Sequence, residues 1–349
     1  MSAMGGASLE TPAASASRED MDALQALLGR PVDAAERVGA GRNSRVYRVR
    51  CGEAEYAAKF YFKPTADGRD RLQVEFSGLA FLWQRGVRCI AQPVRADAAR
   101  QVALYRFVHG EPVAAGDVSA GDIDQLLSFV AELKAIKADA QARALNPAAE
   151  AFFSVAGVMS NLRQRLARLE ALDAQGAAYD ALRRFLGEQF KPALNVFGER
   201  AAAGSGAELA LKYRTLSPSD LGFHNSLRGA GGRLVFLDFE YFGWDDPAKT
   251  LADCLLHPMM RLAPERRQQL VAGFDGIFGA DSGWSGRVKA LYPLFALKWC
   301  MIMLNEYRLE QIERRRYVDL NAEEIQVIQM RQLESARALL QRTLREQAA

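Results

Sequence analysis

The hydrophobic periodicity of the chain changes near Gly110, and this change constrains the fold more than any other feature of the sequence. Before it, residues 37–49 and 55–62 alternate apolar and polar side chains, which is typical of strands, and a further strand pair is expected within 91–108. Residues 69–85 carry apolar side chains at the spacing of one helical face. After Gly110, a 3.6-residue period predicts long helices at roughly 122–143, 150–173 and 177–202.

This pattern predicts an α+β fold, with an N-terminal antiparallel sheet and one prominent helix followed by a larger, mainly helical lobe. We expect residues 1–18 to form a disordered tail, because they are rich in Ala, Ser and Gly. Residues 19–110 would form the N-terminal lobe, and residues 111–349 the C-terminal lobe.

Charge and cysteine usage narrow the class of protein. Lys and Arg total 45 against 42 Asp and Glu, so the net charge of +3 gives no case for nucleic acid or an anionic membrane as partner. The four cysteines form no C-x-x-C pair, which fits a reducing, cytoplasmic setting. The N-terminus lacks the apolar core of an export signal. The apolar stretch 291–304 is interrupted by Lys298 and predicts a buried helix.

The most informative polar residues lie in two loops of the second region. Asp220 precedes Asn225 by five positions, and after a glycine-rich turn the apolar strand 234–237 runs into Asp238. Mg²⁺ prefers carboxylate and amide oxygens, so this layout suits one base and two metal ligands. The alternative is that all three are turn and cap residues, which Asp and Asn favour. An Asp that ends a wholly apolar strand favours the metal site.

Phosphoryl transfer would also need a phosphate cradle and a cation, and the first lobe holds a candidate for each. A glycine loop between two predicted strands could approach a polyphosphate closely or form a plain hairpin turn. Its residues of interest are Gly39, Gly41, Asn43 and Ser44. Lys59 lies on the third predicted strand, and Glu75 on the following helix could hold it as an ion pair. A lone lysine on a strand more often protects a sheet edge from aggregation. The pair of Lys59 and Glu75 therefore indicates a phosphate site only in combination with the glycine loop.

These segments resemble the aminoglycoside-phosphotransferase and choline-kinase family, relatives of eukaryotic protein kinases. The family pattern is H-G-D-x-x-x-x-N, then an I-D-F/W-E/D strand end and a G-x-x-D-P turn. The chain reads P-S-D-L-G-F-H-N, then L-D-F-E and G-W-D-D-P. The resemblance implies a bilobal protein-kinase-like fold and a small-molecule kinase that uses ATP or GTP with Mg²⁺. The first lobe would bind the nucleotide, with the adenine near residues 106–110.

The resemblance also implies a role for each matching residue. Asp220 would be the catalytic base or would orient the acceptor hydroxyl, and Asn225 and Asp238 would bind Mg²⁺. Lys59 would contact the phosphates, with Glu75 as its brace, beneath the glycine loop.

The chain departs from the family pattern just before Asp220. Pro218 and Ser219 stand where the pattern has His and Gly. That His usually supports the loop rather than reacting, so the change bears on loop geometry more than on reaction class. We interpret His224 as structural, and His109 and His257 as surface or packing residues.

The resemblance implies a small-molecule hydroxyl as acceptor, which the sequence does not identify. Acidic and basic residues are nearly balanced in 241–349, which disfavours a polycationic aminoglycoside and leaves a sugar or amino alcohol. An aromatic group could stack on a sugar or a choline-like cation, or could be core: Tyr241, Phe242 and Trp244. An acidic group could line a pocket or fix the loop: Asp245, Asp246 and Asp253.

Two other functions compete with the small-molecule kinase. A catalytically silent, nucleotide-binding scaffold could act through protein contacts, and the missing His would fit such a loss. A protein kinase is disfavoured because no D-F-G to A-P-E activation segment follows Asp238.

Overall fold

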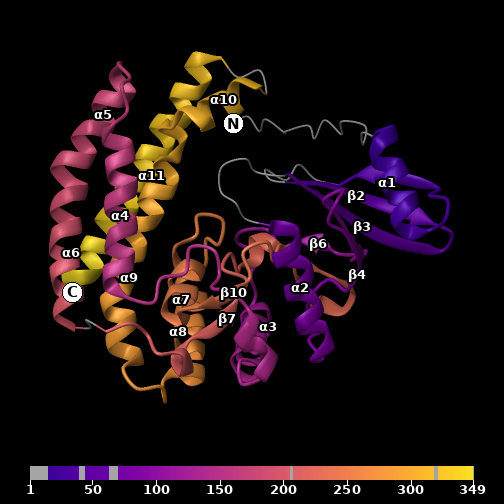
Figure 1. The fold of residues 1–349 in the computed structure, drawn as a ribbon. Coiled ribbons are helices and arrows are strands. Elements are labelled where there is room, and N and C mark those ends of the chain that lie inside the picture. The colour runs from indigo at the N-terminus through magenta and orange to yellow at the C-terminus, as the bar shows by residue number, and fades with distance from the viewer. Residues whose placement is uncertain (1–14, 39–43, 63–69, 205–206, 318–320, 349) are drawn as a thin grey trace, which may run out of the picture. The chain divides into compact units, whose positions relative to one another are not determined.

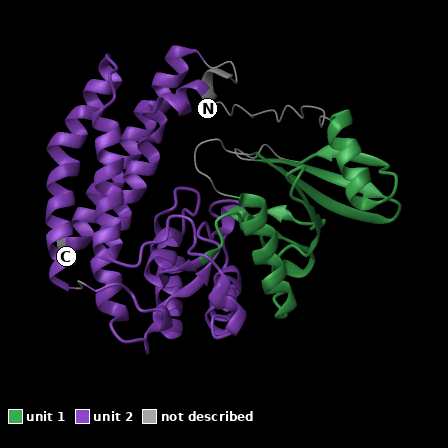
Figure 2. Cartoon of the chain, viewed as in Figure 1, with its two compact units in different colours: residues 1–113, 225–243 green, residues 114–224, 244–349 purple. Residues whose placement is uncertain are grey.

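The computed structural model describes residues 15–38, 44–62, 70–204, 207–317 and 321–348 (Figure 1). The chain forms two compact units, which Figure 2 shows in two colours. Unit 1 comprises residues 1–113 and 225–243, and unit 2 comprises residues 114–224 and 244–349. Residues 225–243, which the sequence analysis placed in the second lobe, therefore group with the sheet of the first. The tail was expected to reach residue 18, whereas Ser15 forms a bridge with Glu36 and Ser17 caps the first helix.

Unit 1 is built on a five-stranded antiparallel sheet in the order β1-β2-β3-β5-β4. Its elements are α1 (Arg18–Leu28), β1 (Ala34–Arg37), β2 (Ser44–Cys51), β3 (Ala54–Tyr61), α2 (Arg71–Gln84), β4 (Pro93–Asp97) and β5 (Val102–Arg106). The side chain of Asp70 caps α2 by accepting from the backbone N–H of Gln73. Lys59 lies on the central strand β3, where it is paired with Val46 on one side and Ala103 on the other.

A second, three-stranded sheet completes unit 1, in the order β6-β8-β9. Its strands are β6 (Glu111–Pro112), β8 (Ser226–Arg228) and β9 (Leu234–Phe236). Strands β8 and β9 form an antiparallel hairpin in which Ser226 pairs with Phe236. The hairpin register therefore places the residues just before β8 and just after β9 at the same end, where the N–H of Leu237 donates to the carbonyl of Asn225 at 2.8 Å.

Unit 2 is mainly helical, and the buried helix α9 is at its centre. Its helices are α3 (Ala120–Ile136), α4 (Val155–Glu170), α5 (Ala177–Phe185), α6 (Lys191–Gly204), α7 (Pro247–Leu256), α8 (Pro264–Phe278), α9 (Trp284–Met303), α10 (Leu309–Tyr317) and α11 (Ala322–Ala348). Strands β7 (Thr215–Ser217) and β10 (Gly243–Asp245) form a two-stranded sheet. Helix α9 packs against α4, α6, α7 and α11, which confirms the buried helix expected near residues 291–304.

Helix α7 starts at a point that the sequence marks clearly. Asp246 caps it by accepting from the N–H of Ala248, and Pro247 occupies the first turn, where its missing N–H costs nothing. Every residue of α7 is buried. The helix thus emerges directly from the G-W-D-D-P turn and is enclosed by the rest of unit 2.

The α+β organisation expected from the periodicity is confirmed, with an antiparallel sheet first and a helical part after it. Within the described ranges, no helix combines the length and the apolar character that crossing a bilayer requires.

Candidate active site

In unit 1, Lys59 is surrounded by carboxylates. Its ammonium lies 2.7 Å from Glu75 Oε2, 2.8 Å from Asp238 Oδ1 and 3.9 Å from Glu240 Oε2. Lys59 is 9% exposed and Glu75 is 3% exposed, whereas the Asp238 side chain is 39% exposed. The pairing of Lys59 with Glu75 that the sequence suggested is thus present, and the Asp238 carboxylate completes it from a position 179 residues further along the chain.

Burial and charge act in opposite directions at this cluster. Burial alone would lower the pKa of Lys59, but Glu75, Asp238 and Glu240 outweigh it and raise that pKa, so the ammonium stays charged. Burial raises the pKa of Glu75, and Lys59 opposes the rise. The hydroxyl of Tyr61 donates to Glu75 at 2.8 Å and so fixes the carboxylate further. Lys59 and Glu75 thus form a buried ion pair, and the partly exposed carboxylate of Asp238 lies beside it.

Asn225 and Asp238 are brought together by the β8–β9 hairpin, since they flank its two strands at the same end. Asp238 has φ +63°, a left-handed conformation that costs a non-glycine residue roughly 1–3 kcal/mol. The next N–H, that of Phe239, donates to Glu75 Oε1 at 3.2 Å and helps to hold this turn. Strained residues persist only where surrounding contacts hold the backbone in place, and they are found mostly at functional sites.

The glycine loop is only partly described. Gly39, Gly41 and Asn43 lie outside the described residues. Ser44 is the first residue of β2, is buried and pairs with Tyr61 of β3. The expected phosphate contacts of this loop stay predictions.

In unit 2, Asp220 lies beside two histidines. His224 Nε2 is 3.1 Å from Asp220 Oδ1, and His257 Nε2 is 4.0 Å from the same oxygen. The imidazole rings of His224 and His257 stack in parallel, with centroids 3.8 Å apart and planes 5° apart. Burial lowers the pKa of His257 to about 4, and the neighbouring His224 contributes in the same direction. From the sequence, His224 is expected to be structural and His257 to be a surface or packing residue, and no local pattern indicates their contact with Asp220.

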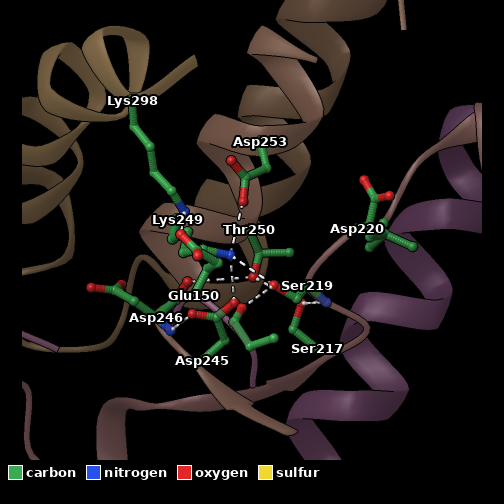
Figure 3. A network of polar contacts seen from close by, with 12 residues as sticks. Glu150, Ser217, Ser219, Asp220, Asp245, Asp246, Lys249, Thr250, Asp253 and Lys298 are labelled. Carbon is green, nitrogen blue, oxygen red and sulfur yellow. Dashed lines mark hydrogen bonds and ion pairs between the residues drawn. The ribbon is translucent and has the colours of Figure 1, made fainter. Parts of the chain in front are cut away.

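A buried polar network supports the same loop (Figure 3). The Lys249 ammonium lies 2.8 Å from Asp245, 2.9 Å from Asp253 and 3.1 Å from the hydroxyl of Ser219. Burial would lower the pKa of Lys249, but the two carboxylates outweigh it and raise that pKa. Lys249 and Asp253 are spaced i, i+4 on α7, a spacing that places them on one face of the helix, so the sequence offered a signal for this pair, whereas Asp245 ends β10 before the helix begins.

Two roles were open for the acidic group of Asp245, Asp246 and Asp253: lining a pocket or fixing the loop. The described contacts of these residues support the second role. Asp245 and Asp246 are fully buried, and Arg287 contacts Asp246 through its Nε at 2.6 Å. Phe242 and Trp244 are also buried, as expected if the aromatic group is core, whereas Tyr241 is partly exposed. Burial raises the pKa of Tyr241 to about 12.

The order of these elements is that of a kinase-like fold, which solved small-molecule phosphotransferases also have. Among solved structures, the chain is similar to a spectinomycin phosphotransferase in complex with ADP and spectinomycin, with a TM-score of 0.62 and 13% identity over 92% of this chain and 99% of that chain. It is also similar to choline kinase LicA from Streptococcus pneumoniae, with a TM-score of 0.58 and 16% identity over 93% and 96%. The chain is similar as well to an aminoglycoside phosphotransferase from Alicyclobacillus acidocaldarius. The TM-score is 0.54, with 14% identity over 93% of this chain and 96% of that chain. No protein-family model and no curated protein matches the sequence. These similarities confirm the fold that the motifs implied.

Proposed function

We propose that the chain is an ATP- and Mg²⁺-dependent phosphotransferase that phosphorylates a hydroxyl of a small molecule. The observation that carries the proposal is the buried Lys59–Glu75 pair, which reaches Asp238 at the end of the β8–β9 hairpin. Phosphoryl transfer depends on positioning and on charge stabilisation, and a fixed ammonium beside a metal-binding carboxylate supplies both. The fold is shared with a spectinomycin phosphotransferase solved in complex with ADP and with AMP, which favours ATP over GTP.

The geometry and the family pattern support a role for each of these residues. Lys59, held by Glu75, would contact the nucleotide phosphates. Asn225 and Asp238 would hold Mg²⁺, which neutralises phosphate charge when it is bound. Asp220 would orient the acceptor hydroxyl and accept its proton.

The cluster fits a divalent cation by its charge and its donor atoms. The carboxylate oxygens of Glu75, Asp238 and Glu240 lie within 4.8 Å of one another. These three carboxylates face two cations, the Lys59 ammonium and the Arg71 guanidinium, whose Nε lies 4.0 Å from Glu240 Oε1. Oxygen donors of this type are those that Mg²⁺ prefers. The partial exposure of Asp238 leaves room for the waters and phosphates that complete its coordination.

We infer that the acceptor is a neutral sugar or an amino alcohol and not a polycation. Three carboxylates that could have formed a cation pocket are engaged instead with Lys249 and Arg287: Asp245, Asp246 and Asp253. We also propose a cytoplasmic location, where ATP is available.

A thermal-shift titration with ATP and with GTP, each with and without Mg²⁺, tests the proposal. A ligand at 100 times its Kd stabilises the folded state by about 2.7 kcal/mol, enough for a clear shift in melting temperature. We expect a Mg²⁺-dependent shift with ATP that Asp238→Ala removes. Asp97→Asn is the matched control, because among the described residues this unit 1 carboxylate pairs with its close neighbour Arg100, at 2.7 Å. An unaltered shift in Asp238→Ala would refute the site.

An acceptor screen then separates the two candidate functions. The chain with Mg²⁺ and ATP is incubated with sugars and amino alcohols, and ADP release is measured against the Asp220→Asn variant. Pro218, in the place of the family's His, is the observation that favours a silent scaffold. Nucleotide binding without transfer to any acceptor would support that second candidate, whereas acceptor-dependent ADP release that Asp220→Asn abolishes would exclude it.

A further inference from the structure

The backbone just before Asp220 is held in an unfavourable conformation. Ser219 has φ +68°, in the left-handed region that glycine adopts most readily. The family pattern has Gly at this position, so the chain keeps the conformation while replacing the residue that suits it. A side chain at such a position needs contacts that compensate for the strain.

The Ser219 side chain makes those contacts. Its hydroxyl donates to the carbonyl of Ala149 at 2.8 Å and accepts from the Lys249 ammonium at 3.1 Å. The N–H of Ser219 donates to the hydroxyl of Ser217 at 3.0 Å, and Ser217 in turn accepts from Thr250 at 3.3 Å. Lys249 and Thr250 are both residues of α7, so this helix anchors the turn that leads into Asp220 (Figure 3).

The carboxylate of Asp220 is held from the other side by His224. The ring nitrogen Nδ1 of His224 is buried and has no hydrogen-bond partner among the described residues, whereas Nε2 faces Asp220 at 3.1 Å. A carboxylate only accepts hydrogen bonds, so the proton of a neutral His224 belongs on Nε2, where it donates to Asp220. Gly222 permits this placement, because a Cβ there would come within 2.5 Å of the His224 ring.

Helix α7 also supports His224. His257, the C-cap residue that follows α7, stacks on the His224 ring. The Trp299 ring packs edge-on against His257, and its indole N–H donates to Asp253 at 2.9 Å. Asp253 in turn binds Lys249. The contacts on the two sides of Asp220 are therefore joined through one helix.

The three side chains Asp220, His224 and His257 could also suggest a metal site, since their ligand atoms lie within 4.8 Å of one another. The ring geometry opposes this reading. Parallel stacked rings direct their nitrogen lone pairs side by side instead of toward one ion, and a metal on Nε2 would force a proton onto Nδ1, which lacks an acceptor. The arrangement is suited to holding the carboxylate.

We propose that Ser219 and His224 are positioning residues for Asp220, and that α7 holds them through Lys249 and His257. In this chain they take over the loop support that the family assigns to the His two positions before the catalytic Asp. The inference rests on the proposed function, because it takes Asp220 as the residue that meets the acceptor hydroxyl.

The first test needs no turnover. The chain has only three histidines, so ¹⁵N spectra of the imidazole rings of the full-length protein give three resolvable spin systems. We expect the His224 ring to be protonated on Nε2 at pH 7, and its Nε2 signal to shift in Asp220→Asn. A ring protonated on Nδ1, or an Nε2 signal that Asp220→Asn leaves in place, would overturn the proposal.

The second test uses kinetics, with His224→Gln and His224→Asn as a matched pair. The amide nitrogen of Gln coincides with Nε2 of His, whereas that of Asn coincides with Nδ1. We expect His224→Gln to keep kcat within about threefold, and His224→Asn to lower it by about tenfold or more with the KM for ATP unchanged, because a misplaced catalytic group slows the reaction without weakening nucleotide binding. Equal kcat values for His224→Asn and the wild type would refute the role of His224.

Ser219 is tested in the same assay. Ser219→Ala keeps the strained backbone and loses both hydroxyl contacts, so we expect kcat to fall by about tenfold. Ser219→Gly loses the same contacts but relieves the backbone strain, so we expect a smaller fall in kcat. Ser335→Ala on α11 is the control, because its hydroxyl donates only to the carbonyl of Arg331 in the same helix. Full kcat in Ser219→Ala would refute the role of Ser219. A chain that binds no nucleotide would defeat the proposed function as well, whereas full turnover in His224→Asn and Ser219→Ala defeats this inference alone.

Discussion

Replacing Lys59 by Met tests the electrostatic argument for the candidate site directly. Methionine retains most of the length of the side chain but removes the charge that Glu75, Asp238 and Glu240 share. Glu75 is 3% exposed, so the variant leaves a buried carboxylate without its cation. Breaking a buried ion pair in this way costs about 3–5 kcal/mol of folding free energy.

The loss should depend on pH, because Glu75 can escape the penalty by taking up a proton. Without Lys59 the pKa of Glu75, already raised by burial, rises further above its value in the unfolded chain. The folded state then binds more protons than the unfolded state above the unfolded pKa. Stability therefore falls as the pH rises through that window, by up to about 1.4 kcal/mol per pH unit.

The assay is urea unfolding at pH 5.5 and pH 8, with amide hydrogen exchange to locate the change. We expect Lys59→Met to be less stable than the wild type at both values and worse at pH 8, with faster exchange in β3 and α2 of unit 1. The double variant Lys59→Met/Glu75→Gln should lose the pH dependence. Lys289→Met, at an exposed position on α9, is the control for the substitution itself.

Two results would refute this reasoning. A loss below about 1 kcal/mol for Lys59→Met would mean that the pair is solvated and behaves like a surface salt bridge. A pH dependence that persists in the double variant would mean that a group other than Glu75 takes up the proton.

Three further predictions concern stability and can be measured by urea unfolding. Gly78→Ala should lower the free energy of unfolding by about 1–3 kcal/mol, because a Cβ on α2 would lie 2.6 Å from the Phe242 ring. A Cβ at Gly276 on α8 meets nothing within 4 Å, so Gly276→Ala should raise the free energy of unfolding by about 0.5–1 kcal/mol. The pKa of His257 is lowered to about 4, so the wild type should lose up to about 3 kcal/mol as the pH falls from about 6.5 to 4, and His257→Phe should lack that part of the pH dependence. Ser119→Ala should cost about 1 kcal/mol, since it removes the capping box at the start of α3.

Local sequence determined the elements of this protein and the order of its chemical groups. Alternating and 3.6-residue periods predicted the strands of unit 1 and the long helices of unit 2, because side-chain direction along a strand or helix depends on neighbours only a few residues away. The same reasoning predicted the partner of Lys59, since Glu75 lies on the helix that follows its strand. The motif around Asp220 and Asp238 predicted the fold through its resemblance to a family.

Tertiary structure alone decided which charges are buried together. Nothing local indicates that Asp238 reaches Lys59, because strand pairing and hairpin register bring them into contact across 179 residues. The i, i+4 pair of Lys249 and Asp253 is visible in the sequence, yet on a solvated helix it would be an ordinary charged pair. Packing encloses α7, removes water from this pair and brings Asp245 of β10 to Lys249, and the buried Lys249 becomes an anchor for the Ser219 turn. Likewise, His257 lies beside Asp220 only because the end of α7 packs there, and burial, which no spacing encodes, sets its pKa.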